Sequence, residues 1–128
     1  MSGPLLDRID LHIEVPAVPY KELRGHDRGA NSAEMRERVG AARERQQRRG
    51  FYNAHIPHNR LRTLCALDDA GERTLELAVR KMGLSARAHD RILKVARTIA
   101  DLAGAGEVSA RHLAEAVQYR SLDRTYWN

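Results

Sequence analysis

The stretch SARAHDRILKVARTIADLA, residues 85–103, decides the fold of this chain. Ser85 is a residue type that caps helix N-termini, and Gly104 and Gly106 interrupt any helix that follows it. Between them, apolar side chains recur at helical spacing on one face: Ala88, Ile92, Val95, Ile99 and Leu102. The stretch therefore predicts a long helix, to about Ala103, with one side turned to a core.

Further helices are predicted on both sides of this stretch. Upstream, a helix starts near Ser32, where Asn31 and Glu34 have the spacing of a capping box, and Gly50 stops it. A short helix is expected from Arg60 to Ala66 with Asn59 as its cap. The residues expected on the inner face of the first helix are Met35, Val39, Ala42 and Gln46.

Two more helices complete the predicted set. Asp68 caps one that ends at Gly83, and Ser109 caps the last. Their expected inward residues are Gly71, Leu75, Ala78 and Met82 in the first, and Leu113, Ala116 and Val117 in the second. Tyr119, Tyr126 and Trp127 are expected to pin the tail.

The N-terminal segment has a different pattern. Leu11, Ile13 and Val15 alternate with polar residues, which predicts a short strand that Pro16 and Pro19 end. Residues 20–31 show no periodicity and are interpreted as a linker. A lone strand leaves its backbone unpaired, so residues 1–31 are expected to be poorly ordered in this chain.

These patterns predict an all-α fold: a compact bundle of four to five helices in residues 32–128, preceded by a strand and loop stub in residues 1–31. The 128 residues suffice for one domain with a real core. The formal net charge of +5 suits an anionic partner such as nucleic acid, a nucleotide or an acidic protein surface, although an arginine-rich proteome would give the same bias.

Cysteine usage and hydropathy favour a cytoplasmic location. Cys65 is the only cysteine, so no internal disulfide forms, and it is expected to be a small buried hydrophobe rather than a nucleophile. Neither a signal peptide nor a long apolar span is evident, so no membrane partner is expected.

Several catalytic motifs are missing. No GxxxxGK[ST] phosphate cradle occurs, and the acidic pair Asp68 and Asp69 after an apolar run fits a helix cap better than a Walker B strand. The six histidines have no metal-ligand spacing, so no metal site is expected. The chain alone is therefore not expected to hydrolyse ATP.

Two arginines remain as candidate functional residues. Arg8 lies at the edge of an apolar run between Asp7 and Asp10, where a surface ion pair with either aspartate is the alternative. Arg87 lies in the first turn of the long helix, where positive charge opposes the helix dipole, so it is a candidate anion ligand. Arg91 and Lys94, four and seven residues further on, are weaker candidates on the same stripe, and a solvated face is the alternative.

The first helix carries six arginines, at positions 36, 38, 43, 45, 48 and 49. Glu34, Glu37 and Glu44 alternate with them and allow i,i+3 or i,i+4 pairs. A solvated, partly paired helix is the favoured interpretation, with contact to a phosphate backbone second.

Four blocks of the sequence together resemble the C-terminal region of the magnesium chelatase-like AAA+ ATPases, in particular the competence branch of that family. The blocks are SGPLLDRIDLHIEVP (2–16), MRERVGAARERQ (35–46), GLSARAHDRILKVARTIADLA (83–103) and HLAEAVQYR (112–120). The first and third are the more specific, and the resemblance covers nearly the whole chain.

The resemblance implies that Arg8 is an arginine finger acting in trans on a neighbouring subunit, and that Arg87 is the sensor 2 arginine of a helical lid. It implies hexameric rings that use ATP and Mg²⁺, bound by an ATPase core of the same protein, and a role for DNA in branch migration. Because the P-loop, Walker B and sensor 1 are absent, the chain is expected to be an excised lid without a cofactor of its own. The alternatives are a magnesium chelatase subunit proper, a free-standing basic module that binds nucleic acid, and an interaction module without a nucleotide role.

Overall fold

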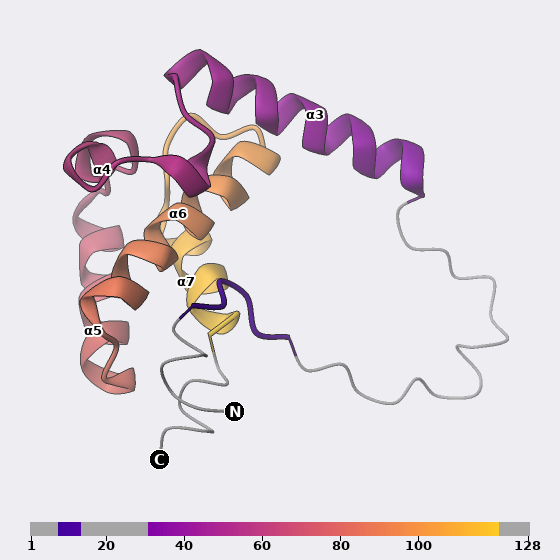
Figure 1. Ribbon diagram of the computed structural model, residues 1–128. Coiled ribbons are helices and arrows are strands. Elements are labelled where there is room, and N and C mark those ends of the chain that lie inside the picture. Colours follow the sequence, from indigo (N-terminus) through magenta and orange to yellow (C-terminus); the bar gives the residue numbers. More distant parts are fainter. Residues whose placement is uncertain (1–7, 14–30, 121–128) are drawn as a thin grey trace, which may run out of the picture.

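The computed structural model describes residues 8–13 and 31–120. Within these ranges the chain forms five α-helices and one short 3₁₀ turn (Figure 1). They are α3 (Ser32–Arg49), η1 (Asn53–His55), α4 (His58–Leu64), α5 (Asp69–Met82), α6 (Ala86–Leu102) and α7 (Ala110–Gln118). The described residues contain no strand, only one isolated bridge between Leu67 and Val108, so the predicted all-α class is confirmed.

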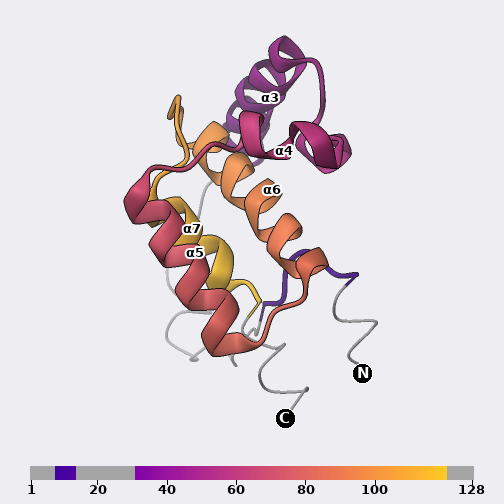
Figure 2. The same ribbon diagram turned by 90° about the vertical axis from the view of Figure 1, so that its left-hand side faces the viewer.

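Helix α6 lies at the centre of the bundle. It packs against α7, α3, α4 and η1, while α5 packs against α7 (Figures 1 and 2). On α6 the apolar residues that are buried are Ala88, Ile92, Leu93, Ala96 and Ala100. They join buried residues of the other elements, namely Ile56, Leu61, Cys65, Leu75, Val108, Leu113 and Ala116. Of the stripe that the sequence predicted, Ala88 and Ile92 are buried, whereas Val95, Ile99 and Leu102 are only half-buried, so the buried face of α6 is turned toward Leu93, Ala96 and Ala100.

The helix ends follow the predicted capping residues. The side chain of Asn31 accepts a hydrogen bond from the Glu34 amide, that of Asp68 from the Gly71 amide, and that of Ser85 from the Ala88 amide. Each bond satisfies a backbone N–H that the first helical turn leaves without a partner. Gly50 and Gly83 end α3 and α5 with φ of 100° and 60°, a left-handed conformation that suits glycine.

Two details of the helix prediction are wrong. The short helix α4 begins at His58 after Pro57 and ends at Leu64, and Asn59 is not its cap. Pro57 is itself the N-cap residue, and because its ring carries no hydrogen-bond acceptor, the helix begins without a side-chain cap. On α3, Met35 and Val39 are exposed because the first half of this helix extends beyond α6 (Figure 1).

The predicted strand is also wrong over its described residues. Leu11, His12 and Ile13 form no strand, and their burial is the reverse of the expected pattern, since His12 is buried while Leu11 and Ile13 are exposed. The His12 amide donates to the Tyr119 carbonyl at the end of α7. The poor order expected for residues 1–31 stays a prediction; Val15, the linker up to residue 30, Tyr126 and Trp127 lie outside the described residues.

Cys65 is buried, as predicted, and burial raises the pKa of its thiol to about 11. Since the thiolate is the reactive form, we expect the folded chain at pH 8 to react with iodoacetamide about 100-fold more slowly than the chain unfolded in urea. Mass spectrometry of quenched time points measures both rates. Equal rates in the two states would contradict the buried position.

Candidate functional site

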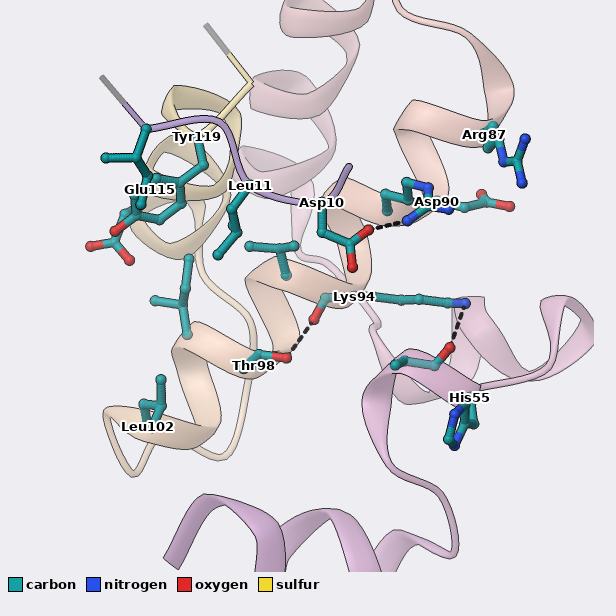
Figure 3. Close-up of a pocket in the computed structure, with 15 residues that line it drawn as sticks. Asp10, Leu11, His55, Arg87, Asp90, Lys94, Thr98, Leu102, Glu115 and Tyr119 are labelled. Carbon is teal, nitrogen blue, oxygen red and sulfur yellow. Dashed lines mark hydrogen bonds and ion pairs between the residues drawn. The ribbon is translucent and has the colours of Figure 1, made fainter. Parts of the chain in front are cut away.

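A cavity of about 850 Å³ lies along one side of α6 (Figure 3). Its walls come from the N-terminal segment, η1, α6 and α7. Along α6, basic residues line it near the start of the helix and apolar residues line it further on (Figure 3). The cavity therefore has a charged part and an apolar part that are built on the same helix.

The charged part contains Arg87, Arg91 and Lys94, which the sequence predicted on one stripe. Successive positions four and three residues apart lie on one face of a helix, and the structure brings all three side chains to this cavity. Asp90 and, from η1, His55 also line it. Asp10, which pairs with Arg91, lines the same part, so two carboxylates face the three cations and their formal charges sum to +1, while Glu115 lines the cavity further along.

Arg87 is the most available of these cations. Its side chain is exposed in the first turn of α6 and has no hydrogen-bond or ion-pair partner among the described residues. The first turn of α6 contains no acidic side chain. The N-terminal backbone N–H groups and the guanidinium are therefore both positioned to attract an anion.

The two weaker candidates are already engaged. Arg91 forms an ion pair with Asp10 of the N-terminal segment, and its side chain is 24% exposed. The Lys94 ammonium donates to the Ala54 carbonyl at 3.3 Å (Figure 3). An anion bound at Arg87 would therefore lie near Arg91 and Lys94, both of which already have hydrogen-bond or ion-pair partners.

Arg8 is not part of the cavity. It is exposed, and the structure shows no ion pair between it and Asp10, whose carboxylate binds Arg91 instead. The other aspartate considered for Arg8, Asp7, lies outside the described residues. Of the predicted site residues, the structure thus brings together the three on α6 and leaves Arg8 apart.

The apolar part of the cavity is lined by side chains of α6, of α7 and of the N-terminal segment. They include Val95, Ile99, Leu102, Tyr119 and Leu11. Such a surface accommodates a flat or apolar group, while the basic part accommodates a negative charge. The cavity therefore presents both a charged and an apolar surface along α6.

Sequence reasoning missed a buried polar cluster between α3 and α6. The Asp101 carboxylate is fully buried and accepts from Arg49 Nη1 at 2.9 Å and Nη2 at 2.5 Å, and from Asn53 Nδ2 at 2.9 Å. Arg97, 4% exposed, contributes a second ion pair at 3.2 Å, and Arg45 donates to the Asp101 carbonyl at 2.7 Å. The sequence contained one partial signal, the spacing of Arg97 and Asp101, which allows an i,i+4 ion pair on one helix.

The cluster gives two arginines near the end of α3 a structural role, so no ligand is needed to account for them. Arg45 and Arg49 bind α6 and are not part of a solvated face, which corrects that interpretation for these two residues. Arg36, Arg38, Arg43 and Arg48 are exposed. Of these, Arg43 stacks over the Tyr52 ring with 4.9 Å between the guanidinium carbon and the ring centroid.

The described helices include none long and apolar enough to cross a bilayer. Across residues 8–13 and 31–120, no three His, Cys, Asp or Glu side chains are grouped to hold a metal ion.

Comparison with known proteins identifies the family to which the chain belongs. Residues 29–120 match the family described as magnesium chelatase, subunit ChlI C-terminal, and the chain therefore belongs to this family of C-terminal domains. It is 48% identical over 97% of its length to the competence protein ComM of Haemophilus influenzae. It is 46% identical, again over 97%, to the uncharacterized protein YifB of Salmonella typhimurium, and 34% identical over 94% to an uncharacterized protein of Mycobacterium tuberculosis.

The family resemblance predicted from the four sequence blocks is thereby confirmed. The chain spans about a quarter of the length of each of these relatives, 25% in every case.

Proposed function

We propose that this chain is the nucleotide-sensing lid of a ring-forming AAA+ ATPase whose ATPase core lies in the remainder of a longer protein. The observation that carries the proposal is Arg87: an exposed arginine without a described partner, at the basic part of a cavity on the central helix, in a member of this family. A guanidinium suits this role because it is always charged and can contact two phosphate oxygens at once.

In this proposal Arg87 contacts a phosphate of bound ATP as the sensor 2 residue, and Arg91 and Lys94 add positive potential beside it. The apolar side of the cavity gives the nucleotide a surface to contact. ATP and Mg²⁺ are bound mainly by the core, and Arg8 reaches the nucleotide of the neighbouring subunit in a hexameric ring. The name of the ComM relative, a competence protein, favours a DNA-remodelling motor over a magnesium chelatase subunit proper.

The experiment uses a hybrid protein in which this chain replaces the matching 126 residues of the Haemophilus influenzae ComM. The hybrid should hydrolyse ATP, whereas the isolated chain, which has no P-loop, should not. A hybrid that binds ATP and assembles but shows no turnover would contradict the proposal, as would turnover by a purified isolated chain.

Arg87→Ala provides the residue-level test. In the isolated chain we expect the free energy of unfolding to change by no more than roughly 0.5 kcal/mol, since Arg87 has no described partner and opposes the helix dipole. In the hybrid the same change should impair nucleotide-dependent turnover. Urea unfolding and ATPase assays measure the two effects separately.

Arg111→Ala is the matched control for Arg87. Arg111 is also exposed and is also the second residue of its helix, α7, but it does not line the cavity. It should leave turnover unchanged. A loss of several kcal/mol in the Arg87→Ala chain would show that Arg87 is a structural residue, and equal turnover of the two variants would remove the sensor role.

The free-standing nucleic-acid module is tested with the same isolated chain. That alternative predicts binding to duplex DNA that weakens steeply with salt, because cations on the protein displace counterions from the phosphates. The proposal predicts that strong DNA binding requires the hybrid. Fluorescence anisotropy at 50 and 200 mM salt distinguishes the two.

A further inference from the structure

Three contacts fix residues 9–12 on the helical bundle. Arg120, 1% exposed, donates through Nη1 to the Ile9 carbonyl at 2.8 Å. The His12 amide donates to the Tyr119 carbonyl, and the Asp10 carboxylate pairs with Arg91 on α6. We call these contacts the N-terminal clamp.

The clamp includes a buried, hydrogen-bonded side chain and is therefore more than a contact between two surface segments. Burying a guanidinium is costly unless its N–H groups are hydrogen-bonded, so the chain bears the cost of placing Arg120 in the interior. One of the groups that satisfies it is the backbone carbonyl of Ile9, 111 positions away in the sequence. The N-terminal segment and the end of the helical bundle are thus joined through a buried side chain.

The clamp connects the two arginines of the proposed mechanism. Arg8 directly precedes Ile9, whose carbonyl is bound by Arg120. Arg87 lies one helical turn before Arg91, whose side chain is bound by Asp10 (Figure 3). The backbone next to Arg8 and the helix that carries Arg87 therefore belong to one packed unit.

We infer that Arg120 and Asp10 are positioning residues for Arg8: they fix the backbone beside this arginine on the helix that carries Arg87. The inference rests on the proposed function. A small misplacement of a catalytic group costs a large factor in rate, so an arginine that must reach a neighbour's phosphate needs a fixed base. With the clamp closed, a movement of α6 caused by nucleotide at Arg87 is transmitted directly to Arg8.

The first test measures amide hydrogen exchange of the isolated chain by NMR. Asp10→Asn and Arg120→Gln should each accelerate exchange at the His12 amide by about tenfold or more, while amides at the centre of α6, such as Ala96, keep their protection. Arg120→Lys, which retains a charge and a donor, should restore part of the His12 protection. Arg111→Gln is the matched control, because it removes the same charge from an exposed site on the neighbouring helix.

The Asp10 variant keeps the test decisive if Arg120→Gln unfolds the chain. The Asp10 side chain is 53% exposed, so its replacement cannot destroy the core. Unchanged exchange at His12 in Asp10→Asn would show that the pair with Arg91 does not hold the segment, and the inference would be overturned.

The second test uses the hybrid with ComM. Asp10→Asn and Arg120→Gln should lower kcat for ATP by about tenfold and leave KM and nucleotide binding close to those of the parent hybrid. A merely structural role would lower activity only in proportion to the folded fraction, which circular dichroism measures. Faster exchange at His12 together with an unchanged kcat overturns the positioning role and leaves the proposed function intact.

Failure of the proposed function has a different signature. In that case Arg8→Ala itself would leave turnover of the hybrid unchanged, whatever the clamp variants do. Support for the inference therefore requires a loss of kcat in Arg8→Ala and a smaller loss in both clamp variants.

Discussion

Asp101→Ala is expected to destabilise the isolated chain by about 3–5 kcal/mol, the usual cost of removing one partner of a buried ion pair. Asp101 is fully buried and binds both Arg49 and Arg97. Without its carboxylate, the 4% exposed Arg97 and the partly buried Arg49 lose their counterion, and Asn53 loses an acceptor. Urea unfolding monitored by circular dichroism gives the change from the midpoint and slope.

Asp69→Ala is the control for this substitution. Asp69 is exposed in the first turn of α5, so its loss should cost less than about 1 kcal/mol, the value of a surface charge near a helix dipole. The double variant Asp101→Ala/Arg49→Met should recover part of the stability, since it also removes one of the unpaired charges. If Asp101→Ala and Asp69→Ala cost the same, the cluster does not hold α3 on α6.

The helix ends were predictable because they depend on neighbours in the sequence. Asn31, Asp68 and Ser85 each bond a backbone amide three residues ahead, so residue type and spacing carry the whole signal. The glycines that end α3 and α5 are equally local, since they adopt the left-handed conformation that other residues avoid.

The faces of the helices were less predictable, because burial depends on where two helices cross. Met35 and Val39 share a face with buried Ala42, yet α3 extends past its contact with α6 and leaves them exposed. Asp101 was not singled out at all, yet it is fully buried, because Arg49, 52 positions earlier, binds its carboxylate there. No periodicity in one helix can reveal such a partner.

The candidate site was likewise predictable only where its residues lie on a single helix. The stripe of Arg87, Arg91 and Lys94 was predicted from spacing on one helix, and all three residues line one cavity, while their role in binding stays a prediction. The Asp10 partner of Arg91 lies 81 positions away and could not be inferred. The strand predicted around His12 failed for a related reason: its amide finds the Tyr119 carbonyl of the helical bundle, where a strand would have needed a sheet.

Arg8→Ala in the hybrid is expected to reduce kcat for ATP hydrolysis by about 10³-fold or more, which is the usual contribution of an arginine finger to phosphoryl transfer. ATP binding should stay close to that of the parent hybrid, because the finger acts on the charge that develops in the transition state. Arg8 is exposed and lies apart from the cavity, so the substitution should leave folding unchanged. Steady-state turnover and equilibrium nucleotide binding separate the two effects.

Action of Arg8 in trans predicts a further result, which would not be observed if Arg8 only formed a surface ion pair. Suppose that Arg8 acts on ATP bound by the neighbouring subunit. A hybrid with Arg8→Ala and a second hybrid with an inactivated P-loop should then each be inactive alone. In mixed rings, however, some interfaces combine the intact P-loop of the first hybrid with the intact Arg8 of the second. Mixing them should therefore restore part of the turnover, with a maximum near equal amounts. Arg8→Lys should not substitute for the parent, since an ammonium lacks the forked donors of a guanidinium. If Arg8→Ala kept full turnover, Arg8 would be only a solvated surface charge. If the mixtures stayed inactive, Arg8 would act on the nucleotide of its own subunit.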